Sequence, residues 1–395
     1  MAALTIAPED KSIALADLVR APYPIYSRLR AETPIVRVPA VGRTFITKAA
    51  DTRYVKDTPA LFSSDEPNTP QIRAYHVKTL LRRDGEDHAR IRNAMAPAFS
   101  AASIKDVWVP AYTKVAEEYV GRLPKGETVD LFQVLAGPIA ARCLAHVLGI
   151  TNASDEKLQL WSQALIDGSG NFSRNPAVFE ATDRAHEEMN VCIAQATASH
   201  LANPNASALS AMVNAADPIE HEQILANIKV AIGGGINEPR DSLLTAVYGL
   251  LTNPDQMEAV RADDALWSTV FEESVRWVAP IQVSSRRVSE DTELRSCVLR
   301  KDELLLTIQA SANRDEEIYE NGHVFDIFRK KAPHQAFGSG PHYCLGMHIA
   351  RRAVGQIILP RLFDRFPKMS LPDHSAVVFS GFAFRGPITL PVHLS

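Results

Sequence analysis

The sequence contains few cysteines, and none is arranged as a zinc knuckle or a disulfide framework. The four are Cys143, Cys192, Cys297 and Cys344, with no C-x-x-C pair and no histidine cluster at zinc-finger spacing. Because small secreted folds depend on dense cysteine frameworks, this usage predicts a reducing compartment.

Long apolar runs are absent as well. No stretch of about 18 uninterrupted apolar residues occurs, and residues 1–11 lack a basic start followed by an apolar run. The 42 basic and 46 acidic residues are interspersed, with a net charge of −4, so no basic stripe for nucleic acid is present. These features predict a cytoplasmic protein that binds a small molecule, with no nucleic acid and no membrane as partners.

Internal repeats and linkers are also missing from the sequence. A chain of 395 residues that is 46% hydrophobic can bury one large core. The sequence therefore predicts a single domain over residues 1–395.

Helical periodicity dominates the chain, so we expect a mainly α fold with small sheets. The predicted helices are 24–31, 50–57, one that begins at 84, 104–123, 129–148, 157–166, 181–201, 220–251 and 266–278. The predicted strands are 35–38, 44–47, 281–288, 303–307 and others within 379–394. Residues 62–71 are rich in Ser, Asp, Pro and Asn and predict the start of a long loop, with Tyr75 in or just after it.

The predicted helix 220–251 contains residues that normally weaken a helix. Gly233, Gly234 and Gly235 each lower helix stability by about 1 kcal/mol relative to alanine. Pro239 removes one backbone hydrogen bond and clashes with the preceding turn. Such a stretch can leave room for a flat ligand, oxygen or water against the backbone. The alternative is two helices with a Gly-rich joint.

The stretch 337–346 reads Phe-Gly-Ser-Gly-Pro-His-Tyr-Cys-Leu-Gly and surrounds Cys344 with residues that permit tight turns. A loop of this kind can direct several N–H groups at the thiol and favour the thiolate. Apolar residues at helical spacing follow it, namely Ala350, Val354, Ile357 and Ile358. A stabilised thiolate beside apolar walls suits an axial ligand of heme iron. The alternative is a turn that holds a small buried cysteine.

Two further pairs of residues are spaced to share a helix face. His88 and Arg92 are four apart, and Glu273 and Arg276 are three apart. His88 and Arg92 can donate hydrogen bonds to carboxylates or phosphates, although a solvated helix face is the commoner explanation for an isolated His/Arg pair. A buried Glu273–Arg276 pair would need a further partner to offset its desolvation.

Taken together, these motifs resemble the cytochrome P-450 family over nearly the whole chain. The loop 337–346 matches the heme-thiolate signature, with Phe337, His342, Cys344 and Gly346 at its diagnostic positions. The resemblance implies a triangular prism of helices with small β-sheets. It also implies a heme b whose iron is ligated by Cys344, placed between the long Gly/Pro-interrupted helix and the Cys-loop helix.

The resemblance also assigns roles to the charged residues. Glu273, Arg276 and Arg329 match the structural ionic cluster of the family. His88, Arg92, Arg286 and His342 match the residues that hydrogen-bond the heme propionates. Charge-assisted hydrogen bonds from these side chains would hold the ring in place.

One motif departs from the family pattern. Where the family has an acid followed by threonine on the long helix, this chain has Asn237 and Glu238, followed by a proline. Either Glu238 delivers protons itself, with a pKa raised by burial, or water does so around it. The departure raises the prospect that peroxide substitutes for dioxygen and electrons.

The altered run and the C-terminal tail resemble bacterial guaiacol-type O-demethylases. In such a relative, the residues that face the substrate are Tyr75, Phe172, Ile232, Gly235, Ile281, Ser284, Ser285 and Phe384. The resemblance implies a monooxygenase that hydroxylates a methoxy carbon of a small methoxyphenol, so that the hemiacetal collapses to a phenol and formaldehyde. The alternatives are a hydroxylase or peroxygenase of another small apolar substrate, and a non-catalytic heme sensor.

Electron delivery is expected to come from another protein. The sequence has no Gly-rich dinucleotide fingerprint after a strand and no cysteine set for an iron–sulfur cluster. We therefore expect O2, a small aromatic substrate and a separate electron-transfer partner, either a ferredoxin or a flavin/iron–sulfur reductase.

Overall fold

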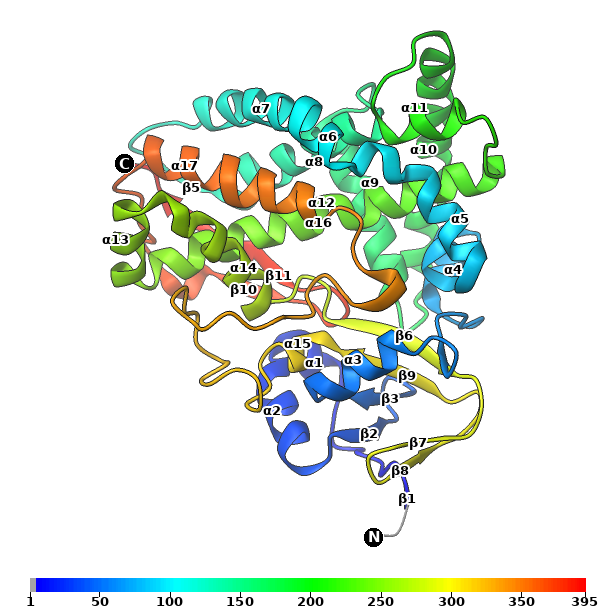
Figure 1. The fold of residues 1–395 in the computed structure, drawn as a ribbon. Helices are drawn as coiled ribbons and strands as arrows, with labels where there is room; N and C mark the ends of the chain where they lie inside the picture. Colours follow the sequence, from blue (N-terminus) through cyan, green and yellow to red (C-terminus); the bar gives the residue numbers. More distant parts are fainter. Residues whose placement is uncertain (1–4) are drawn as a thin grey trace.

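The computed structural model describes residues 5–395, so the first four residues of the segment 1–11 lie outside it. Figure 1 shows a large helical part above a smaller part in which the N-terminal strands and the strands of residues 283–308 lie side by side. The protein is thus mainly α with small sheets, as the sequence predicts.

The helices that build the larger part begin near residue 70. They are α4 (Pro70–Tyr75), α5 (Gly85–Met95), α6 (Ala101–Ser103), α7 (Val109–Gly121), α8 (Gly137–Leu148), α9 (Asp155–Ser169), α10 (Pro176–Ala202), α11 (Ala208–Val213), α12 (His221–Leu251), α13 (Pro254–Ala262), α14 (Trp267–Trp277), α16 (Met347–Ala350) and α17 (Leu359–Arg365). The helices beside the main sheet are α1 (Leu15–Arg20), α2 (Pro22–Glu32), α3 (Ala49–Asp57) and α15 (Gln309–Ala312).

The helix ends follow local chemistry. The Ser154 side chain accepts a hydrogen bond from the Lys157 N–H at the start of α9. Asn175 caps α10, with Pro176 in its first turn. Gly149 ends α8 in a left-handed conformation, with φ of 79°.

The main sheet has five strands in the order β2-β3-β9-β6-β4. Its strands are β2 (Ile35–Val38), β3 (Arg43–Ile46), β4 (Phe62–Ser63), β6 (Val283–Val288) and β9 (Leu304–Ile308). Three smaller sheets have the orders β1-β8-β7, β10-β11 and β12-β5. Their strands are β1 (Thr5–Ile6), β5 (Thr128–Asp130), β7 (Thr292–Leu294), β8 (Cys297–Leu299), β10 (Val378–Ser380), β11 (Gly386–Thr389) and β12 (Pro391–His393). The parallel pairing of β3 with β9 joins the N-terminal hairpin to the segment before the Cys344 loop.

The largest apolar core lies among the helices, and α12 runs through it. Ile228, Ile232, Ile236 and Val247 of α12 are fully buried there. A second apolar cluster joins α1 and α2 to the main sheet, and a third packs on strands β6, β8 and β9. Within the described residues, no helix combines the length and apolarity that crossing a membrane would require.

Two predicted elements differ from the structure. The predicted helix 129–148 begins as strand β5, because residues 128–130 pair with β12 at the far end of the chain. The predicted loop after residue 62 contains β4 and leads into α4, whose start is capped by the Thr69 side chain, so Tyr75 is helical. Helix α12 continues through Gly233 and Pro239 without a break, which excludes the alternative of two helices.

Candidate functional site

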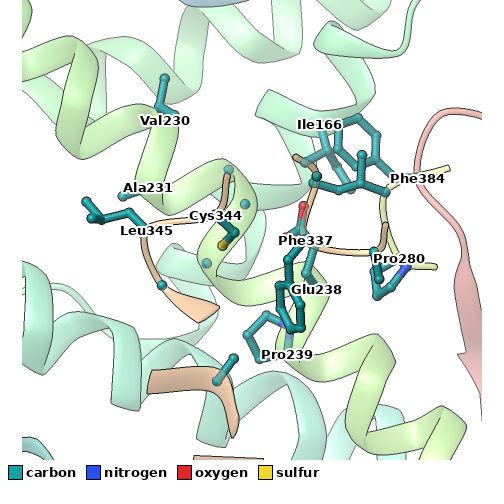
Figure 2. A pocket seen from close by; sticks show the side chains of 18 of the residues that line it. Ile166, Val230, Ala231, Glu238, Pro239, Pro280, Phe337, Cys344, Leu345 and Phe384 are labelled. Carbon is teal, nitrogen blue, oxygen red and sulfur yellow. The ribbon is translucent and has the colours of Figure 1, made fainter. Parts of the chain in front are cut away.

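A cavity of about 420 Å³ lies between α12 and the loop around Cys344. Its walls also come from α4, α8, α9, β6, the helix after Cys344 and residues 383–384. Figure 2 shows Cys344 on one side of the view, Phe384 and Ile166 on the other, and Glu238 between them. Most of the lining is apolar, and the polar groups reach it at a few defined points.

The loop before Cys344 is built from tight turns. Gly338 and Gly340 have φ of 76° and 64°, which favour glycine. A Cβ on Gly340 would lie 2.7 Å from the backbone oxygen of Lys56, so this glycine also permits close approach to α3. The Cys344 N–H donates to the Phe337 oxygen at 2.9 Å and closes the loop.

The Cys344 sulfur is accessible to the cavity although protein surrounds the residue. Burial raises the pKa of the thiol, while hydrogen bonds from the N–H groups of Gly346 and Met347 and the charge of Arg92 act to lower it. These N–H groups stand at the start of the helical run formed by α16, η7 (Arg351–Ile358) and α17. The predicted helix after the cysteine is therefore present, and its first amides stabilise negative charge on sulfur.

Three of the four predicted cationic residues line the cavity, namely Arg92, Arg286 and His342. His88 does not reach the lining; its ring lies behind His342, with the ring centroids 4.2 Å apart. Burial lowers the pKa of His88 to about 4 and that of Arg286 to about 10. The Nε2 atom of His88 and the Nε atom of Arg286 are buried without a hydrogen-bond partner.

Sequence reasoning missed two cations at the same wall. Lys56 of α3 and Arg82 of η1 (Leu80–Arg82) both line the cavity. Lys56 Nζ donates to the side-chain oxygen of Gln335 at 3.1 Å, and Arg82 Nε donates to that of Gln71 at 2.6 Å. Only the fold turns these side chains inward, since each stands in a polar segment that reads as ordinary surface.

Glu238 is the ionisable residue of α12 that reaches the cavity. Its carboxyl group lies alongside the preceding turn, where a Cβ on Gly234 would be 3.5 Å from Oε1. Both carboxyl oxygens are buried without a hydrogen-bond partner. Burial raises the pKa of Glu238 well above its ordinary value, and the nearby charge of Asp241 raises it further. Burial therefore favours the protonated form of Glu238.

Two residues that were predicted to face the cavity do not line it. Asn237 is buried, and its Nδ2 donates to Ser162 Oγ of α9 at 2.6 Å. Ser162 Oγ in turn donates to the Gly233 oxygen at 3.0 Å, so Asn237 joins α12 to α9. Ile232 is fully buried in the helical core. The helical turn explains both corrections, because it presents Gly235 and Glu238 to the cavity and carries these two side chains away from it.

The other predicted substrate-facing residues all line the cavity. They are Tyr75, Phe172, Gly235, Ile281, Ser284, Ser285 and Phe384. Ile281 and Phe384 are far apart in sequence but form an antiparallel bridge. Backbone hydrogen bonds flank this bridge, from Gln282 N to Ala383 O at 2.9 Å and from Arg385 N to Pro280 O at 2.8 Å. The C-terminal turn is thereby fixed against the segment before β6.

The predicted ionic cluster is assembled behind the cavity. Arg276 binds Glu273 through two hydrogen bonds of 2.6 Å. Arg276 also donates to the carbonyl oxygens of Asn313, Gly322 and Val324. Arg329 Nε lies 3.6 Å from Glu273 Oε1. The cluster therefore joins α14 to the irregular segment that leads to the Cys344 loop.

Comparison with known proteins gives a consistent result. The sequence profile described as "Cytochrome P450" matches residues 171–377. The chain is 27% identical over 375 residues to "Putative cytochrome P450 YjiB" of Bacillus subtilis, covering 92% of this chain and 93% of that protein. It is 28% identical over 381 residues to "Linalool 8-monooxygenase" of Pseudomonas putida, covering 91% and 93%.

A solved structure also shares the fold. It is the complex of P450BioI with an acyl carrier protein that carries hexadec-9Z-enoic acid. The TM-score is 0.87 at 24% identity, with 96% of this chain and 100% of that chain covered.

Proposed function

Because this chain belongs to the cytochrome P450 family, and so is a heme-dependent monooxygenase, we propose that it demethylates a small methoxyphenol. Its cofactor is a heme whose iron is ligated by Cys344. Members of the family use O2 and receive electrons from a redox partner. The observation that carries the proposal is the small cavity with aromatic walls opposite Cys344.

The residues of this chain fit the cofactor. The Cys344 sulfur faces the cavity, and two backbone N–H groups favour its thiolate form. The Nε atom of Arg286 is buried and unpartnered at the same wall, as expected of a donor that awaits an anionic group. Arg92, His342, Lys56 and Arg82 add positive or donor groups to this wall. A ring with two propionates matches this charge distribution.

The proposed propionate contacts are Arg92, Arg286 and His342, with Lys56 and Arg82 as additional basic residues; burial lowers the pKa of Lys56 well below its ordinary value, and a propionate beside it would oppose that shift. His342 Nε2 is already within 2.9 Å of Ser64 Oγ and 3.3 Å of Asp84 Oδ1, which fix its ring. His88 supports that ring from behind. When bound, the heme supplies the oxygen-activating chemistry.

The substrate side of the cavity favours one small aromatic ring. A porphyrin must occupy the part of the cavity beside Cys344, so the substrate is confined to the remainder, which Tyr75, Phe172 and Phe384 line. Phe172 and Phe384 supply flat apolar surface, and Tyr75, Ser284 and Ser285 offer hydroxyl groups. The aromatic ring of a methoxyphenol would pack on the two phenylalanines, and its hydroxyl group would hydrogen-bond to the tyrosine or a serine.

The reaction requires controlled protonation beside the cysteine. One atom of O2 enters a C–H bond of the methoxy group, and two electrons and two protons reduce the other atom to water. The resulting hemiacetal loses formaldehyde and leaves a phenol. Glu238 is placed to supply a proton, because its acid form is favoured by burial and both of its oxygens lack protein partners.

A peroxide-driven oxidation is a second candidate, and Glu238 favours it as well. A carboxylic acid that replaces the usual alcohol can relay a proton, because its carbonyl oxygen accepts one from hydrogen peroxide while its hydroxyl group donates one to the leaving oxygen. In that case one peroxide replaces O2, two electrons and two protons.

Turnover with a surrogate reductase tests the proposal. We expect guaiacol to produce a substrate-induced shift of the heme spectrum, and NADH-driven turnover to yield one formaldehyde per phenol product. A terpene such as linalool and a fatty acid serve as competing substrates. The proposal is overturned if guaiacol and its ring-substituted analogues cause no shift while a terpene or fatty acid is bound and hydroxylated.

A further inference from the structure

Outside the cavity, a chain of hydrogen bonds joins α12 to α4, the short helix that carries Tyr75 into the cavity wall. Lys229 Nζ lies 2.8 Å from Nδ1 of His186, which belongs to α10. His186 Nε2 lies 2.7 Å from the carbonyl oxygen of Ala74 in α4. None of these three residues lines the cavity. We call Lys229, His186 and Ala74 the α4 clamp.

The partners determine how the histidine is protonated. A lysine ammonium can only donate, so His186 Nδ1 accepts from Lys229. The proton of neutral His186 is therefore on Nε2, which donates it to the Ala74 oxygen. That oxygen belongs to the last turn of α4, whose carbonyl groups have no donors within the helix. Lys229 thus maintains the tautomer that holds the end of α4.

The clamp contains a buried lysine, and the desolvation of its charge destabilises the folded protein. Lys229 is only 6% exposed, and burial lowers its pKa to about 8, with no carboxylate among the described residues to oppose that shift. An apolar side chain of similar length would avoid the desolvation of this charge. The gain from Lys229 must therefore lie in the orientation of His186 rather than in overall stability.

A second set of contacts holds the other side of Tyr75. The ring of His76 stacks on that of His186, with centroids 4.1 Å apart and planes at 16°. His76 has φ of 58°, so the backbone turns sharply after Tyr75. His76 Nε2 lies 2.6 Å from Asp183 Oδ1, and Arg73 binds both oxygens of Asp183 at 2.7 Å. Both residues that flank Tyr75 are thus fixed to α10.

The side chain of Tyr75 lies very close to the backbone of α12. Its hydroxyl oxygen would be 2.3 Å from a Cβ on Gly233, so the phenol lies directly on the backbone of α12. Lys229 is one helical turn before Gly233 on the same helix. Helix α12 therefore contacts Tyr75 directly and holds its backbone indirectly through the clamp.

We propose that His186 and Lys229 are positioning residues, which hold Tyr75 over Gly233 and thereby set the affinity of the cavity for aromatic ligands. The inference rests on the proposed role of Tyr75 in the substrate wall and is independent of which aromatic substrate is used. It requires that changes in the clamp act through Tyr75.

Ligand titrations of the heme-loaded enzyme test this. The variants are Lys229→Met, which keeps the length of the side chain, and His186→Phe, which keeps the stacked ring. The probes are 4-phenylimidazole, whose aromatic ring would reach the wall, and imidazole, which is too small to do so. We expect each variant to weaken 4-phenylimidazole binding about three- to tenfold, the value of one hydrogen bond, and to leave imidazole binding unchanged. The thermal midpoint of Lys229→Met should stay the same or rise.

Two further measurements separate positioning from a general structural effect. In a Tyr75→Ala background, Lys229→Met should cause no additional loss of affinity, because coupled residues are not additive. Lys229→Gln, which still offers a donor to His186, should recover part of the affinity. The inference is overturned if Lys229→Met leaves 4-phenylimidazole affinity within twofold, if imidazole affinity falls equally, or if the loss persists without Tyr75. A wild-type enzyme that binds 4-phenylimidazole but not guaiacol would refute the proposed substrate and leave this test valid.

Discussion

Glu238→Gln is the substitution that most directly tests how protons reach the reaction. Glutamine has nearly the same shape as the protonated acid and can still donate a hydrogen bond, but it cannot release a proton at neutral pH. Both oxygens of Glu238 are buried without partners, so no ion pair or hydrogen bond within the protein is lost. Folding and ligand binding should therefore be nearly unchanged.

The expected effect is on turnover. A positioned general acid typically contributes about 10²-fold or more, and a loss of about 10²-fold corresponds to about 2.7 kcal/mol of barrier. We expect product formed per NADH consumed to fall steeply in Glu238→Gln, with the substrate-induced spectral shift retained. Glu222→Gln, an exposed position in the first turn of the same helix, is the matched control and should behave as wild type.

The pH profile gives an independent measurement. Burial raises the pKa of Glu238, so the acid form persists to higher pH than in a free glutamate and is lost as the pH rises through this raised value. In the wild-type enzyme, the product formed per NADH consumed should decline as the pH rises through this value. Glu238→Gln should show no such decline. If coupling and its pH profile are the same in both proteins, Glu238 is not the proton donor. Glu238→Thr adds a second check, since unchanged O2-driven and peroxide-driven activities would exclude any special proton role.

Three further predictions concern the framework around the cavity. Arg276→Met leaves Glu273 buried without its main partner. This should lower the free energy of unfolding by about 3–5 kcal/mol and the thermal midpoint by roughly 5 °C for a protein of this size. A change below 1 °C in calorimetry would contradict this. Gly340→Ala places a Cβ at positive φ against the Lys56 oxygen and should lower the free energy of unfolding by about 1–3 kcal/mol. Less of the carbon monoxide complex with the red-shifted Soret band should form per protein, and full retention of that complex and of the unfolding midpoint would count against this. For Glu272, burial acts to raise the pKa, but Arg351 and His334 outweigh it and hold the pKa at about 2. This stability is present above the unfolded value near 4.5 and is lost as the pH falls toward 2, so Arg351→Gln should flatten the acid side of a stability–pH curve, and an unchanged curve would exclude the linkage.

The sequence by itself determined the centre of the site. The loop at 337–346 needs glycine where φ is positive, and the helix after it follows from apolar spacing, so both are local properties. The long helix and its Gly–Pro stretch could also be predicted from the sequence. The sequence left open whether this helix continues through Pro239. That continuity depends on packing on all sides of α12, which local propensity does not include.

The walls of the cavity were decided only by the tertiary structure. Phe384 meets Ile281 through a bridge between distant segments, and β5 forms because β12 returns to it from the end of the chain. Lys56 reads as a surface residue until α3 packs beside the Cys344 loop. The contact between Lys229 and His186 likewise requires three helices to meet. Periodicity and turn chemistry describe the chain over a few residues, whereas these contacts depend on which faces the folded core brings together.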